Sequence, residues 1–175
     1  MLALFAACCG VVVKDGKPYV DQWPASVAKT MAVDGLAQVT DAKRSTRAKN
    51  ILRKLSTWHD EGSFTAIYTD STDRRRLATV AGITRFISSP GGTIDTAFTT
   101  IGPDLGMTTS HRIPIGAAQA VGRCGTGRVD GQRVVVCGWA DHGSLAVAMY
   151  TNRSETEGAA MIRTLRQTLI VRRSN

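Results

Sequence analysis

Apolar residues recur at helical spacing in three parts of the chain. Between residues 41 and 59, the apolar residues at positions i, i+1, i+4 and i+7 are Ile51, Leu52, Leu55 and Trp58. Asp41 is a suitable N-cap for this helix. A second helix is predicted over 90–101, where Pro90 takes the first helical position. A third is predicted over 154–172. Ser154 and Glu157 have the spacing of a capping box, Leu165 lies mid-stripe, and Arg172 and Arg173 close the helix.

Shorter runs of alternating or β-branched residues predict strands between these helices. The expected strands cover 64–69, 77–83, 107–113, 115–124, 133–140 and 145–151. The last of them is apolar on both faces, so we place it in the middle of the sheet, covered on both sides. The predicted fold class is α+β. We expect an antiparallel sheet of about five or six strands, two helices packed on it and the 41–59 helix leading in.

The first forty residues differ from the rest of the chain. Residues 1–13 are uncharged and mostly apolar, and Leu4–Cys8 loosely matches a bacterial lipobox, which makes Cys8 a candidate lipid anchor. We interpret 1–13 as an apolar leader, the remnant of a signal peptide, lipobox or membrane anchor. A buried N-terminal strand is the alternative. Residues 14–40 are predicted to be a neck, and residues 41–175 a single α+β domain.

The composition is that of a globular protein with a basic surface. The 175 residues carry a formal net charge of +8, which suggests affinity for anionic lipid or cell-envelope polymer. No zinc-finger, helix-turn-helix or RNP-like pattern accompanies the charge, so we expect no nucleic acid partner. The cysteine and histidine spacings match no metal site, and neither a metal nor another cofactor is expected.

A hairpin signal predicts the pairing of two cysteines. Asp130–Gly131 is typical of a two-residue type I′ turn. With this turn, Cys124 and Cys137 stand directly opposite each other at a non-hydrogen-bonded pair, where Cα atoms approach closely enough for a disulfide. The alternative is a pair of buried free thiols. Gly125 and Gly127 could introduce a bulge and shift the register.

Asp141, His142 and Ser144 combine the residue types of a serine-hydrolase triad within four positions. Neighbours in sequence rarely converge as a triad requires, and these residues also suit a tight turn between two strands. We therefore assign Asp141 and His142 a structural role, with backbone in the left-handed region that Gly143 tolerates freely. On this interpretation His142→Ala changes stability by less than about 1 kcal/mol, as surface substitutions do.

Arg74, Arg75 and Arg76 form a compact cationic cluster that is a candidate for anion binding. A solvated turn beside a strand is the alternative interpretation. His59, His111 and His142 have no ligand-like spacing.

The stretch from Phe64 to Ile170 resembles a family of actinobacterial, Streptomyces-type proteins of unassigned activity that are membrane-anchored or secreted. The resemblance rests on short runs, of which the most specific is a C-[GA]-W-A-D-H-G-S motif, here Cys137–Ser144. It implies an N-terminal membrane segment or signal, a charged neck and then this domain outside the cell, with the two cysteines at positions that look bridged.

The sequence therefore predicts an exported, membrane-tethered domain that acts in binding or sensing at the cell envelope. We expect it on the extracellular face of the cell membrane, or secreted. Its expected partners are anionic lipid, an envelope polymer or another envelope protein. The alternative function is a hydrolase that uses His142 and Asp141.

Overall fold

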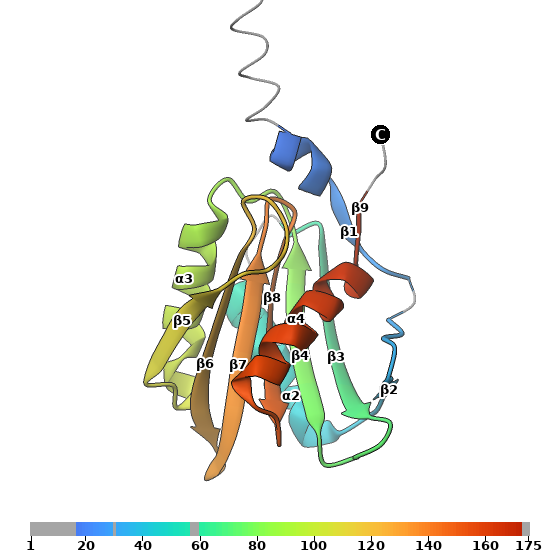
Figure 1. Ribbon diagram of the computed structural model, residues 1–175, viewed down its shortest axis with the longest axis vertical. Coiled ribbons are helices and arrows are strands. Elements are labelled where there is room, and N and C mark those ends of the chain that lie inside the picture. Colours follow the sequence, from blue (N-terminus) through green and yellow to red (C-terminus); the bar gives the residue numbers. More distant parts are fainter. Residues whose placement is uncertain (1–16, 30, 57–59, 173–175) are drawn as a thin grey trace, which may run out of the picture.

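The computed structural model describes residues 17–29, 31–56 and 60–172. Its main element is a seven-stranded antiparallel sheet, in the order β2-β3-β4-β8-β7-β6-β5 (Figure 1). The strands are β2 (Leu36–Gln38), β3 (Gly62–Asp70), β4 (Leu77–Thr84), β5 (Thr109–Ile113), β6 (Val121–Val129), β7 (Gln132–Ala140) and β8 (Ser144–Thr151). A two-stranded sheet joins β1 (Ala25–Val27) to β9 (Ile170–Arg172). The fold class is α+β, as predicted, with one or two more strands in the main sheet than expected.

Helices cover both faces of the main sheet (Figure 1). Helices α2 (Ala42–Leu55) and α3 (Pro90–Ile101) pack on one face, and α4 (Glu155–Leu169) packs on the other. A short helix at 17–22 lies at one end of the sheet. The N-caps of α2 and α4 are those that the sequence predicts. The Asp41 side chain accepts a hydrogen bond from the Arg44 amide, and Ser154 and Glu157 form the capping box.

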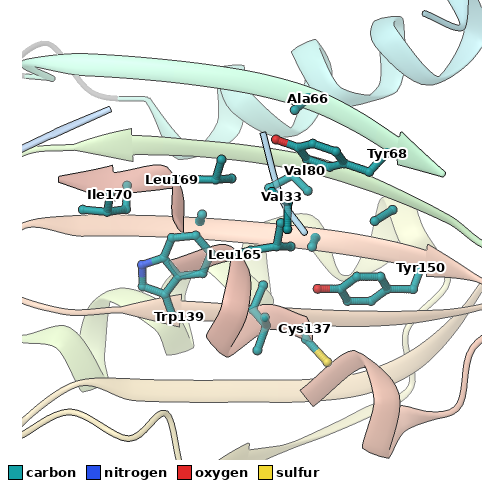
Figure 2. Close-up of a cluster of buried hydrophobic side chains, with 14 of the residues drawn as sticks. Val33, Ala66, Tyr68, Val80, Cys137, Trp139, Tyr150, Leu165, Leu169 and Ile170 are labelled. Carbon is teal, nitrogen blue, oxygen red and sulfur yellow. The ribbon is translucent and has the colours of Figure 1, made fainter. Parts of the chain in front are cut away.

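Strand β8 is the fourth of seven and is buried along its whole length, which confirms the predicted central position. Its even-numbered residues from Ala146 to Tyr150 face α4, and its odd-numbered residues from Leu145 to Met149 face α2 and α3. Figure 2 shows the α4 side of this core, where Trp139, Tyr150 and Leu165 lie together. Strand β8 therefore contributes side chains to both core layers, the one beneath α4 and the one beneath α2 and α3.

Three element boundaries differ from the prediction. The strand expected over 115–124 begins at Val121 and runs on to Val129, because Pro114 and the left-handed residues Gly116 and Gln119 place 114–120 in a loop. The last helix ends at Leu169. Arg172 therefore belongs to β9 and not to a helix terminus. Helix α2 packs on the sheet through Ile51 and Leu55 and does not merely lead into it.

The 14–40 segment supplies two strands that its sequence did not predict. β2 pairs with β3 and forms one edge of the main sheet, and β1 pairs with β9. Cys8, the leader 1–13, Trp58, His59 and Arg173 lie outside the described residues.

The predicted hairpin and disulfide are both present. Val129 pairs with Gln132, and Asp130 and Gly131 have φ values of 52° and 77°, as a type I′ turn requires. Cys124 pairs with Cys137 at a Cα–Cα distance of 4.1 Å, and the two are bridged. The register runs unbroken past Gly125 and Gly127, so no bulge forms there.

Helix α4 lies close above the disulfide because residue 158 is a glycine. A Cβ at Gly158 would stand 2.9 Å from Val135 Cγ1 and 3.2 Å from Cys137 Sγ. The helix then buries Ile162, Leu165 and Leu169 against the sheet.

We expect Leu165→Ala to lower the free energy of unfolding by roughly 2–5 kcal/mol, because it opens a cavity beneath α4. Leu165 is fully buried, whereas Gln167 on the same helix is exposed, so Gln167→Ala is the matched control and should change stability by less than about 0.5 kcal/mol. Chemical denaturation measures both. An unchanged midpoint for Leu165→Ala would contradict this packing.

The disulfide closes a short loop, and removing it with the pair Cys124→Ala and Cys137→Ala should cost about 2–4 kcal/mol. Peptide mapping by mass spectrometry of the unreduced protein should show the bridged pair. Two free thiols at these positions would disprove the bridge.

Candidate functional site

The turn that joins β7 to β8 lies in the protein interior. Asp141 and Ser144 are fully buried, and His142 is 1% exposed. The expectation that His142 behaves as a surface residue is therefore wrong, and the small stability effect expected for His142→Ala loses its physical basis. Sequence patterns place these polar residues in a turn, but only the tertiary structure shows the turn covered by the 17–27 segment and by β9.

The Asp141 carboxylate accepts five hydrogen bonds. Its Oδ1 atom accepts from the amides of Gly143 and Ser144 at 2.9 and 2.8 Å, and from the Ser144 hydroxyl at 3.0 Å. Its Oδ2 atom accepts from Arg166 Nε at 2.7 Å and from Arg172 Nη2 at 2.5 Å. Two guanidinium groups thus neutralise one buried carboxylate.

These contacts join the β7–β8 turn to three other parts of the chain. Arg166 comes from α4 and Arg172 from β9, and Arg172 Nη1 also donates to the Gln22 carbonyl at 2.7 Å. The Ser144 hydroxyl accepts from Trp139 Nε1 at 2.9 Å. We call Asp141, Ser144, Arg166 and Arg172 the Asp141 network.

His142 points into a different set of contacts. Its Nδ1 donates to the Ile87 carbonyl at 2.7 Å, and its Nε2 lies 2.8 Å from Gln119 Oε1. Its ring stacks on Tyr19 with centroids 3.8 Å apart, and its amide donates to Gln22 Oε1 at 2.9 Å. Both ring nitrogens are engaged away from Ser144, so Asp141, His142 and Ser144 do not form the hydrogen-bonded relay of a serine hydrolase.

Gly143 is required for a close approach and not for a left-handed turn. None of Asp141, His142 and Gly143 is among the residues with positive φ, which corrects the expected backbone conformation. A Cβ at Gly143 would collide with the Gln22 carbonyl oxygen and stand 2.7 Å from Ala25 Cβ. The missing side chain lets the N-terminal segment lie directly on the turn.

The arginine cluster lies between β3 and β4, and its members have unequal surroundings. Arg75 pairs with Asp73 at 3.2 Å, and Arg76 pairs with Glu157 and with Asp70. Hydrogen bonds from Thr72, and then from Arg153, lower the pKa of Asp70 to about 2, so it remains charged. Much of the positive charge of Arg75 and Arg76 is thus matched by carboxylates of the protein itself.

A groove of about 650 Å³ separates α3 from the edge strand β5, and no sequence motif indicated it. Its walls include Phe98 and Thr99 of α3 and Thr109 and Ser110 of β5, and Asp95 and Arg123 also line it. Asp95 accepts from Arg112 at 2.8 Å and from Arg123 at 2.5 Å. The hydrogen bond from Arg112, followed by the one from Arg123, lowers the pKa of Asp95.

Aromatic side chains gather where the 17–22 helix meets the β4–α3 loop. Phe86 lies 6.2 Å from Tyr19 and 6.1 Å from Trp23, measured between ring centroids. We call Tyr19, Val20, Trp23 and Phe86 the aromatic patch. No sequence pattern indicated this patch, because Phe86 is more than sixty positions away from the other three residues.

Metal binding finds no support in the part of the chain that the structure describes. No group of three or more potential ligands comes together there, and His111 lies 2.9 Å from Glu155 at the start of α4. Within the same residues, no helix combines the length and the apolar character needed to cross a membrane.

Comparison with protein families and with curated proteins found no match for this chain. No protein-family model matches it, and no curated protein matches it.

We expect Asp141→Asn to lower the free energy of unfolding by about 3–5 kcal/mol, because it leaves two largely buried guanidinium groups without a counter-ion. Their side chains are 12% and 22% exposed. Asp130→Asn is the matched control. Its carboxylate is 50% exposed where it meets Lys43 and Arg47, and an exposed pair contributes only about 0–1 kcal/mol. Equal losses in chemical denaturation would contradict a structural role for the Asp141 network.

Proposed function

We propose that this protein is an exported binding domain, tethered to the membrane by residues 1–13, that takes an extended segment of another envelope protein along β5. The groove beside this edge strand is the observation that carries the proposal. Its volume of about 650 Å³ lies within the range of ligand-binding clefts.

The outer edge of β5 has backbone groups suited to strand addition. Cys124 and Cys137 are closely spaced across β6 and β7, as at a non-hydrogen-bonded pair, so the peptide groups of Cys124 point toward β5. His111 pairs with Cys124, and the peptide groups of its neighbours Ser110 and Arg112 therefore point away from β6. An added strand would pair with those groups, and β5 has no other strand beside it among the described residues.

The charge at the groove favours a partner segment that carries a carboxylate. Arg112 and Arg123 share the single carboxylate of Asp95, so positive charge is in excess there. The Arg112 side chain is 59% exposed and accessible to a ligand, and arginine binds carboxylates with directional hydrogen bonds. The Ser110 carbonyl accepts from Arg123 at 3.3 Å, a contact that an incoming strand would share or displace.

The geometry of the Asp141 network supports binding over hydrolysis. A nucleophile must reach its substrate, whereas the Ser144 hydroxyl is buried and hydrogen-bonded to Asp141 and Trp139. His142 contacts neither the hydroxyl nor the carboxylate through its ring nitrogens. These side chains hold the fold together, whereas the groove is open to a ligand.

The disulfide supports the proposed location of the domain outside the cytosol. Structural disulfides persist in oxidising compartments outside the cytosol, and this one is fully buried in the core on the α4 side of the sheet. The resemblance of the Cys137–Ser144 motif to exported actinobacterial proteins agrees with that location.

The test is selection from a random phage-displayed peptide library against the full chain. Selected peptides should be acidic, and by NMR they should protect the amides of Ser110 and Arg112 from hydrogen exchange. Arg112→Glu should weaken binding by about tenfold or more, because it replaces a charge-assisted hydrogen bond by repulsion.

Arg74→Glu is the matched control, since Arg74 is an exposed arginine in the predicted anion-binding cluster. It should leave the affinity unchanged. Peptides that protect no β5 amide, or that lose affinity with Arg74→Glu and not with Arg112→Glu, would disprove the groove as the site.

A further inference from the structure

We infer that the aromatic patch is the membrane-facing surface of the domain, and that its partner is the interfacial layer of a lipid bilayer. This inference rests on the tether in the proposed function and adds an orientation to it. The 17–22 end of the domain would lie on the membrane, and β5 would stand at one side of the sheet, away from that end (Figure 1).

The distribution of exposed apolar side chains is the first argument. Among the described residues, the large hydrophobic side chains that remain exposed are Tyr19 at 36%, Val20 at 55%, Phe86 at 50% and Val171 at 49%. The first three belong to the aromatic patch, and Val171 lies in β9, next to β1 at the same end of the molecule (Figure 1). Scattered exposed hydrophobics need no explanation, whereas a gathering of this kind marks an interaction surface.

The chemistry of the patch suits an interface between water and hydrocarbon. Tyrosine and tryptophan combine an apolar ring with a polar group, and both are enriched where membrane proteins cross the headgroup layer. Phe86 and Val20 add purely apolar surface beside them.

The path of the chain identifies the bilayer as the occupant. Residues 1–13 carry no charge, and five residues separate Val13 from Tyr19. The six Cα–Cα steps from Val13 to Tyr19 span at most about 20 Å, and less where the 17–22 helix begins, so a membrane that holds residues 1–13 would lie within reach of the patch. Lys14 and Lys17 fall in this connection, where cationic side chains favour anionic headgroups.

The support beneath the patch is rigid. Tyr19 stacks on the buried His142 ring, and Gln22 binds the His142 amide and the Ala118 carbonyl, the latter at 2.6 Å. Arg172 fixes the Gln22 carbonyl to the Asp141 network. Asp141 and His142, the candidate residues of the hydrolase alternative, therefore hold the aromatic rings at the surface.

Tryptophan fluorescence of the full chain can test this inference. The chain has three tryptophans, so Trp58→Phe leaves Trp23 in the patch and Trp139, which is fully buried and serves as a constant reference. The protein is reconstituted into vesicles of phosphatidylglycerol and phosphatidylcholine with brominated acyl chains. We expect a blue shift of the Trp23 emission and its quenching by the brominated lipid.

Phe86→Asp should abolish this quenching while the chain still sediments with the vesicles. Thr156→Asp is the matched control, because Thr156 is exposed in the first turn of α4 and outside the patch, and it should behave as wild type. Sedimentation without quenching in the chain that keeps Phe86 would overturn the membrane-facing patch and leave the tether standing. A chain that does not sediment with vesicles overturns both.

A blue shift of Trp23 that grows with protein concentration in the absence of vesicles would also overturn the inference. It would assign the patch to contact with a second copy of the chain. Binding of acidic peptides along β5 is unaffected by any of these outcomes, so the groove is tested separately.

Discussion

The positions of the 17–27 segment and of β9 depend on how the buried carboxylate of Asp141 is paired. A charge this deep in a protein is strongly destabilising unless it is paired and fully hydrogen-bonded. Here the turn supplies two amides and a hydroxyl, and Arg166 and Arg172 supply the positive charge. Satisfying this one group requires that α4, β9 and the β7–β8 turn meet at the same point.

The 17–27 segment is held by the same arrangement. Gln22 and Tyr19 contact His142, and Arg172 holds the Gln22 carbonyl. Gly143 permits this approach, because any side chain there would collide with the Gln22 backbone. The polar turn therefore has a structural task that explains its unusual density of hydrogen-bonding residues, and the aromatic patch is a direct consequence of it.

The proposed binding functions use two parts of the surface that the core packing leaves exposed. The groove lies at the edge of the sheet, where β5 has no further strand beside it, and the aromatic patch lies at the end where the chain enters the domain. The disulfide and Gly158 lie beneath α4, on the sheet face opposite to α3. Binding at the edge or at the end would thus leave the core packing unchanged.

Local patterns in the sequence determined much of the architecture. Asp130–Gly131 specified a turn whose register placed Cys124 opposite Cys137, since a two-residue turn leaves no freedom in the pairing. Ser154 and Glu157 specified the start of α4, and the apolar run from Leu145 specified a central strand. Each of these signals acts between residues within about fifteen positions of one another, which is why they could be identified without a structure.

The tertiary structure alone decided what is buried and what is exposed at the ends of the sheet. β1 and β2 are too short to have a pattern of their own, and they form because β9 and β3 offer partners. His142 suited an exposed turn by residue type, yet Tyr19, Ile87 and Gln119 enclose it from segments more than twenty positions away. The groove and the aromatic patch likewise arise from segments distant in sequence, so only long-range packing could bring them together.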